Sequence, residues 1–220
     1  MNKPIIFLGP SLSYEKARTI LGEAEYRPPA RKGDLLKLAT MYTAQEYTVG
    51  LVDGLFMQEY PPTPIEVYQL AIRKNVLLLG AASLGALRAV ELEKFGMIGI
   101  GKIFELYKKG KVYADDEVAV TYAEEKNDIQ SEAMIDIRFN LFIAKRNGII
   151  DEFTKSAISR VAKSVYFPFR IYDGILDLTE RRYPVLTTQL ESFRSYIRAH
   201  RQSLKERDTI RLLQYIKQRV

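Results

Sequence analysis

Val76-Leu77-Leu78-Leu79-Gly80-Ala81-Ala82-Ser83-Leu84-Gly85-Ala86-Leu87-Arg88-Ala89 is the stretch of sequence that decides the fold. An apolar run too short for a helix meets residues with almost no side chain, and a helix-forming segment follows. This order predicts a buried strand, a tight turn and a helix that begins at Ser83. The free N–H groups at such a helix start favour negative charge. Ser83 is therefore placed either to cap the helix or to do chemistry.

Strand-like and helix-like segments alternate through the first half of the chain. This alternation indicates a parallel sheet with helices on both faces, so we expect a Rossmann-like α/β fold. The glycine-spaced segment 96–101 follows a helix, so we interpret it as a loop and not as a dinucleotide fingerprint. The expected strands and extended segments are 4–8, 26–30, 47–52 and 76–79, and the expected helices are 13–21, 34–41, 63–74 and 102–109, besides the one from Ser83.

The second half of the chain reads differently. An acidic turn at 115–117 is expected to enter a strand at 118–120, and from Asp128 onward the pattern is helical. We therefore expect an α/β core domain over residues 1–125 and a helical region with a basic C-terminal tail over 126–220. The expected helices of that region are 128–147, 151–163, 187–202 and 203–219.

A local motif predicts one helix start closely. In Thr63-Pro64-Ile65-Glu66, threonine is a favoured N-cap, proline suits the first helical position and glutamate the third. We therefore expect a capping box at this point.

Composition excludes several kinds of chemistry. The chain has no cysteine and one histidine, His200, so disulfides, thiolate catalysis, cysteine-based zinc sites and multi-histidine metal sites are excluded. Three adjacent acids, Asp115-Asp116-Glu117, are able to bind a hard cation only with help from elsewhere, and a solvated turn is the better interpretation for Asp115. We predict neither a metal nor a cofactor.

The net charge of +6 is concentrated in the tail. Residues 181–220 hold ten Lys/Arg against three Asp/Glu. A solvated basic face is favoured over docking to an acidic protein or to nucleic acid, and we do not expect nucleic acid as a partner. No apolar run is long enough to cross a bilayer, and the first residues do not read as a signal peptide, so we expect a cytoplasmic protein. The tail is expected to bury one apolar stripe of Leu186, Leu190, Phe193, Ile197, Leu204, Ile210, Leu213 and Ile216.

Three strand ends carry residues that suggest a shared site. They are Gly9-Pro10-Ser11, Asp53-Gly54 and Ala81-Ala82-Ser83. In a parallel sheet, ligands bind at the carboxyl ends of the strands, near the point where the strand order reverses. We therefore expect the three segments to line one cleft.

The segment around Ser83 has the pattern small-x-Ser-x-Gly of a nucleophile elbow. The N–H of Leu84 and one N–H from the Gly9–Ser11 loop would then form an oxyanion hole. No histidine lies nearby, so a base would be Asp, Glu, Lys or Tyr. The residues alone favour the plainer alternative, in which Ser83 only caps the helix.

Arg88 and Glu91 lie three residues apart on the same predicted helix, so they are able to pair on its surface. Arg88, one turn from an anion-friendly helix start, is also suited to hold a carboxylate or thiocarboxylate.

Taken in order, these pieces resemble the TfuA family. The matching residues include Phe7–Leu12, Val52-Asp53-Gly54, the specific block Gly80–Glu91 and Asp115–Val120. The resemblance covers about residues 5–122 and is expected to weaken beyond them, which makes 1–125 a TfuA-like core domain.

The resemblance implies a function. TfuA-like proteins partner YcaO enzymes, which replace a peptide backbone oxygen by sulfur. For this chain it implies release of sulfide from a ubiquitin-like sulfur carrier with a C-terminal thiocarboxylate, and help in binding the substrate peptide. Ser83 would attack the carrier, Asp53 or Glu91 would orient Ser83 or water, and Arg88 would bind developing charge. The residues expected to bind the substrate are Gly9, Pro10, Ser11, Gly54, Leu84, Asp116 and Glu117. The alternative is a non-catalytic activator that docks YcaO and holds the carrier tail.

Overall fold

The computed structural model describes residues 2–41, 45–55, 60–123 and 128–219. Contacts divide the chain into two compact units, which we call the α/β unit (Met1–Asp115 with Lys205–Val220) and the helical unit (Asp116–Leu204). The domain boundary expected at residue 125 lies outside the described residues, so the limits 1–125 and 126–220 stay a prediction.

A five-stranded, fully parallel sheet forms the centre of the α/β unit, as predicted. Its strand order is β2-β1-β3-β4-β5. The segment expected to be a glycine-spaced loop contains the edge strand β5, so that expectation was wrong. The strands are β1 (Ile5–Phe7), β2 (Glu25–Arg27), β3 (Tyr47–Leu51), β4 (Val76–Ala81) and β5 (Ile98–Ile100).

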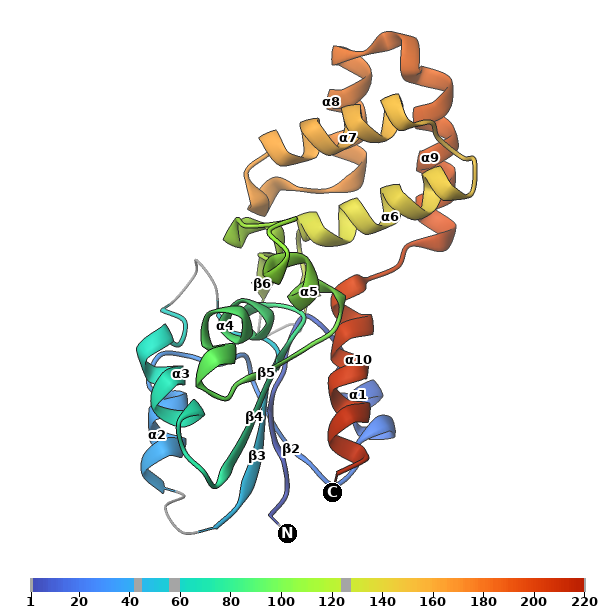
Figure 1. The fold of residues 1–220 in the computed structure, drawn as a ribbon. Helices are drawn as coiled ribbons and strands as arrows, with labels where there is room; N and C mark the ends of the chain where they lie inside the picture. The colour runs from blue at the N-terminus through green and yellow to red at the C-terminus, as the bar shows by residue number, and fades with distance from the viewer. Residues whose placement is uncertain (1, 42–44, 56–59, 124–127, 220) are drawn as a thin grey trace. The chain divides into compact units, whose positions relative to one another are not determined.

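Helices cover both faces of this sheet, which confirms the predicted fold class (Figure 1). One group of helices lies on the side where α1 and α10 are drawn, and the other on the side of α2 and α3. A further helix, α5, follows β5. The bounds are α1 (Tyr14–Ile20), α2 (Asp34–Met41), α3 (Pro64–Ala71), α4 (Leu84–Leu92), α5 (Lys102–Lys108) and α10 (Leu204–Lys217).

The last helix, α10, is part of the core of the α/β unit. Leu212, Leu213 and Ile216 are fully buried in a cluster with side chains of β1, β4 and α1. A Cβ atom at Gly50 of β3 would lie only 3.0 Å from Leu212 and 2.8 Å from Ile6. The bare backbone at Gly50 therefore lets α10 pack closely on the sheet.

The helical unit holds a two-stranded antiparallel sheet and a second core. The strand expected at 118–120 lies at 122–123, and residues 128–129 form a strand where a helix was expected to begin. Helix α8 lies between two expected helices, in a segment where no helix was expected. The elements are β6 (Tyr122–Ala123), β7 (Asp128–Ile129), α6 (Met134–Arg146), α7 (Glu152–Ser164), α8 (Tyr172–Arg182) and α9 (Thr187–His200).

The predicted apolar stripe of the tail is buried, but it is divided between the two cores. Its first half, from Leu186 to Ile197, packs in the core of the helical unit. In its second half, Leu213 and Ile216 pack in the α/β unit, with Ile210 half-buried beside them. Within the part of the chain that the structure describes, no helix combines the length and the apolar character needed to cross a membrane.

Candidate functional site

The three suspected strand ends lie at one edge of the sheet. Strands β1, β3 and β4 are neighbours and run in the same direction, so Gly9–Ser11, Asp53 and Ser83 all follow carboxyl ends at that edge. Strand β1 pairs with β2 on one side and with β3 on the other, which makes the β1/β3 boundary the switch point of the strand order. This is where an open parallel sheet binds its ligands.

Asp53 holds the loop that follows β1. Its side chain is fully buried. Oδ2 accepts hydrogen bonds from the N–H groups of Gly9 at 2.9 Å and Ser11 at 3.0 Å, and Oδ1 accepts one from the Ser11 hydroxyl at 2.6 Å. The N–H groups of Gly9 and Ser11 therefore already donate to the Asp53 carboxylate, and Pro10 has no N–H group. The expectation that this loop supplies an oxyanion donor was wrong.

The turn between β4 and α4 is strained. Ala82 has a φ of +63°, which a residue with a Cβ atom seldom adopts, and Ser83 has φ −108° and ψ −123°. The Ser83 N–H donates to the Ala81 carbonyl at 2.8 Å. A Cβ atom at Gly85 would lie 1.8 Å from the Leu51 carbonyl oxygen, so only glycine allows this close approach of α4 to β3. Strain of this kind is typical of functional turns.

Ser83 does not cap the helix. It occupies the N-cap position of α4, yet its side chain makes no capping hydrogen bond. The described residues offer its hydroxyl no other partner, and the N–H of Leu84 has no backbone acceptor among them. The interpretation of Ser83 as a plain N-cap was therefore wrong. Ser83 as a whole is only 6% exposed, but its Oγ atom is not one of the fully buried polar atoms that lack a partner, so this hydroxyl is open to solvent or to a ligand.

Arg88 and Glu91 form the predicted pair. Nη1 of Arg88 donates to the two carboxylate oxygens of Glu91 at 2.9 and 3.1 Å, and Nε donates to the Pro62 carbonyl at 3.1 Å. These bonds fix the guanidinium against the start of α3. The described contacts join neither residue to Ser83 or Asp53.

Gly54 and Leu84 contact each other at the same sheet edge. A Cβ atom on Gly54 would lie 2.2 Å from Cδ2 of Leu84 and 3.2 Å from the Ala30 carbonyl oxygen. Gly54 also forms a parallel bridge with Ala30. The glycine therefore lets the chain after β3 pass between α4 and the segment after β2.

Asp116 and Glu117 belong to the helical unit and are paired with its cations. Glu117 accepts from Arg138 at 2.8 and 3.0 Å and from Lys163 at 3.0 Å. Asp116 accepts from Lys163 and from the buried Arg170, both at 2.5 Å. Burial opposes ionisation, but these hydrogen bonds hold the pKa of both carboxyls below their ordinary values.

Sequence reasoning missed a buried carboxyl group in the helical unit. Burial raises the pKa of Glu132 to about 7, although the Arg201 guanidinium at 2.8 Å opposes the shift. The backbone N–H of Glu132 donates to the Arg170 carbonyl at 2.7 Å. No periodicity in the sequence marks Glu132, because its burial depends on residues about forty and seventy positions further along the chain.

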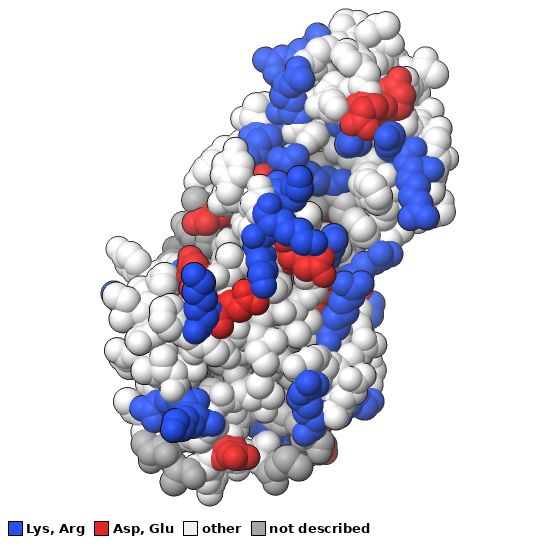
Figure 2. All heavy atoms as spheres, viewed as in Figure 1, with Lys and Arg blue, Asp and Glu red and all other residues white. Residues whose placement is uncertain are grey.

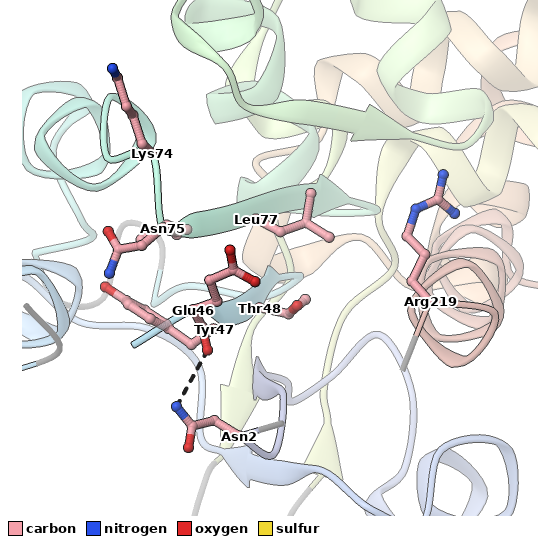
Figure 3. Close-up of a pocket in the computed structure, with 9 residues that line it drawn as sticks. Asn2, Glu46, Tyr47, Thr48, Lys74, Asn75, Leu77 and Arg219 are labelled. Atoms are coloured by element: carbon pink, nitrogen blue, oxygen red, sulfur yellow. Dashed lines mark hydrogen bonds between the residues drawn. The ribbon is translucent and has the colours of Figure 1, made fainter. Parts of the chain in front are cut away.

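A hollow of about 390 Å³ lies at the opposite edge of the sheet, at the amino ends of β3 and β4 (Figure 3). Asn2, Glu46, Lys74 and Arg219 are among the residues that line it, and Asn2 donates to the Glu46 carbonyl at 3.3 Å. Ligands of parallel sheets bind at the carboxyl ends, so this hollow is separate from the candidate site.

The strand order and the strand-end residues define a doubly wound α/β protein of the flavodoxin-like arrangement, with its candidate site at the switch point. The chain belongs to the family of TfuA-like proteins, since the sequence model of that family matches residues 53–171, more than half of its length. This family is associated with YcaO enzymes in thioamidation. No curated protein matches the chain.

The extent of the match bears on the site. It includes Asp53, Ser83 and the Arg88–Glu91 pair, and it begins after Gly9–Ser11. It also continues well past residue 122, where the resemblance was expected to weaken, and reaches the Asp116–Glu117 network of the helical unit. The family match therefore extends beyond residue 122, the expected end of the resemblance.

Proposed function

We propose that this chain is a cytoplasmic sulfide-releasing hydrolase that acts on a thiocarboxylated sulfur-carrier protein and supplies a YcaO enzyme that thioamidates a peptide. Membership of the TfuA-like family supports the thioamidation context. The observation that carries the catalytic part is the unpartnered hydroxyl of Ser83 on a strained turn at the carboxyl edge of the sheet. A serine so placed is exposed to reaction in the same manner as the nucleophile of an elbow turn.

The reaction divides into two steps. The Oγ atom of Ser83 attacks the terminal carbonyl carbon of the carrier; the Oγ–C bond forms, the C–S bond breaks, and sulfur leaves as hydrosulfide with the serine proton. Water then attacks the ester; a new C–O bond forms, the bond to Oγ breaks, one proton of the water returns to Ser83, and the other is released to solvent. The carrier departs as a carboxylate. Hydrosulfide is a good leaving group, so the first step needs little help from a base.

Neighbouring groups have distinct proposed roles. The N–H of Leu84, at the start of α4, would donate to the oxyanion, where the helix end favours negative charge. Arg88, held by Glu91 and the Pro62 carbonyl, would bind charge on the substrate. Asp53 acts through the Gly9–Ser11 loop and not as a base, because three donors already occupy its carboxylate.

A non-catalytic activator is the second candidate. One observation favours it: among the residues that the structure describes, no carboxylate or amine is hydrogen-bonded to Ser83. In this case the same sheet edge would hold the carrier tail while the YcaO enzyme does all of the chemistry.

Sulfide release by the purified chain alone distinguishes the two candidates. The chain is mixed with a carrier that ends in a thiocarboxylate, without any YcaO enzyme, and free sulfide and the intact mass of the carrier are followed. If the chain is a hydrolase, each protein molecule should release many molecules of sulfide, and the carrier should be converted to its carboxylate form. Sulfide release that begins only when the YcaO enzyme is added would support the activator instead.

A further inference from the structure

Helix α3 exposes a stripe of large apolar side chains. Ile65, Tyr68 and Ile72 are spaced three and four residues apart, so they lie on one face of the helix. Phe95, which follows α4, extends the stripe, because its ring packs edge-on against Tyr68 with ring centroids 5.0 Å apart. The four side chains are between 37% and 72% exposed.

This stripe is not the buried face of the helix. The core of the α/β unit already receives Val67, Leu70 and Ala71 from α3. A surface helix normally has a polar outer face, and contiguous exposed apolar side chains mark interaction sites. On the flank of the α/β unit where α2 and α3 lie in Figure 1, Figure 2 shows mostly uncharged surface, with a group of Lys and Arg side chains at its lower end.

The stripe begins beside the candidate site. Nε of Arg88 donates to the carbonyl of Pro62, and Thr63 caps α3 directly after it. Ile65 therefore follows within one helical turn of a residue held by Arg88. A molecule that reaches Arg88 and Ser83 meets the stripe as the neighbouring surface.

The rim of the stripe is positively charged. Arg73, Lys74 and Lys94 have no ion pair within the described part of the chain, whereas Glu93 is neutralised by Lys108 at 2.7 Å. A partner with an apolar patch edged by Asp or Glu would match this surface in both apolar area and charge.

We propose that the stripe of Ile65, Tyr68, Ile72 and Phe95 docks the folded body of the carrier protein whose tail enters the candidate site. The inference rests on the proposed function. Ser83 is only 6% exposed, so the site admits a slender tail, and the affinity for a protein substrate must come from a neighbouring surface. Because the rim of the stripe is positively charged, we expect Asp or Glu side chains at the edge of the carrier surface that binds here.

The test is the double variant Ile65→Ser/Ile72→Ser, with Val185→Ser as its matched control. Val185 is 85% exposed and belongs to the helical unit, whereas α3 belongs to the α/β unit. Binding of the unmodified, carboxylate-ended carrier is measured by calorimetry, which needs no catalysis. We expect the double variant to bind about tenfold more weakly, because a few side chains that become buried in an interface carry most of its binding energy. The KM for thiocarboxylated carrier should rise by the same factor, and the rate of sulfide release from thioacetate should remain as in the wild type.

Three outcomes overturn the proposal. Carrier binding that equals that of the control variant would remove the stripe as the docking face. A wild-type dimer that dissociates in the double variant would assign the stripe to a second copy of the chain, and selective loss of YcaO binding would assign it to that enzyme. If the wild type releases no sulfide but the double variant still loses carrier binding, the proposed hydrolysis fails while the docking face stands.

Discussion

At the scale of single residues, the candidate site separates a structural carboxylate from a reactive hydroxyl. Asp53 is buried with three hydrogen-bond donors, and Ser83 is nearly buried with none. The sequence placed both at strand ends but gave no means of telling their roles apart. The difference comes from the Gly9–Ser11 loop, which folds back over Asp53 from a position more than forty residues away.

Asp53→Ala should destabilise the protein strongly. It leaves the N–H groups of Gly9 and Ser11 and the Ser11 hydroxyl unsatisfied in the interior, which costs about 3 kcal/mol of unfolding free energy. Asp53→Asn retains an acceptor and should cost less. Urea unfolding measures both variants. If folded Asp53→Asn loses sulfide release as completely as a nucleophile variant does, Asp53 takes part in the chemistry and the structural role is contradicted.

Glu132 should make stability depend on pH. Its pKa is about 7 in the folded protein, above its ordinary value near 4.5, so the folded state holds a proton that the unfolded state has lost. The stabilising contribution is complete below about pH 4.5 and is lost as the pH rises through 7. Relative to Glu132→Gln, the wild type should lose about 3 kcal/mol of unfolding free energy across that range.

Urea unfolding of both proteins at pH 5 and pH 8 checks the Glu132 prediction. Glu23→Gln is the control, because Glu23 is an exposed residue of the α/β unit. A stability difference between wild type and Glu132→Gln that is the same at the two pH values would show that Glu132 is not buried in this way.

At the scale of helices and strands, two buried carboxylates cap helices other than their own. The predicted capping box is half correct: Thr63 accepts from the N–H of Glu66, but Glu66 turns away and accepts from Leu35 and Leu36 at the start of α2. Asp208 of α10 accepts from the N–H of Ile103 at 2.7 Å and so caps α5. Local sequence predicts a cap only when its partner is nearby.

Gly101→Ala should be far more costly than an ordinary glycine replacement. Gly101 has φ +98°, and a Cβ atom there would lie 2.3 Å from Cγ of Asp208. Gly110 also has positive φ, +61°, but nothing lies within 4 Å of the added atom. We expect Gly110→Ala to cost about 1 kcal/mol through backbone strain, and Gly101→Ala about 3 kcal/mol or more because the cap is displaced as well.

The double variant Gly101→Ala/Asp208→Ala separates the two contributions. The cost of Gly101→Ala should be smaller in the Asp208→Ala background, because the carboxylate that blocks the Cβ atom is gone. It should stay above the cost of Gly110→Ala, because φ +98° with ψ −179° strains an alanine more than φ +61° does. Equal costs of Gly101→Ala in the two backgrounds would contradict the cap described for α5.

At the scale of the whole molecule, the parallel sheet was predictable from sequence. The edge strand β5 and the packing of α10 on the sheet were not. The apolar run of β4 and the small residues after it are strong local signals. Strand β5 is short and contains Gly99, which is needed because the Phe104 ring would lie 2.2 Å from a Cβ atom there, so it resembled a loop. The packing of α10 against Gly50 joins residues about 160 positions apart, and no local pattern encodes such a contact.

Deletion of residues 205–220 should abolish cooperative unfolding of the α/β unit. It uncovers the sheet face that packs against Leu212, Leu213 and Ile216, each worth about 2 kcal/mol of burial. Deletion of 218–220 alone is the control, because it leaves these three side chains in place. Calorimetry of both truncated proteins measures the effect. An unchanged unfolding transition in the longer deletion would mean that α10 is not part of this core.

The central claim is that Ser83 is the nucleophile, and one comparison tests it most directly: sulfide release from thiocarboxylated carrier by Ser83→Ala and by Ser13→Ala, each at matched folded concentration. Ser13 caps α1 by accepting from the N–H of Lys16 at 3.3 Å, so Ser13→Ala should lose about 1 kcal/mol of stability and keep its activity. Ser83 makes no such bond, so Ser83→Ala should unfold like the wild type and release no sulfide above the rate without protein. If folded Ser83→Ala released sulfide at the same rate as the wild type, Ser83 could not be the nucleophile.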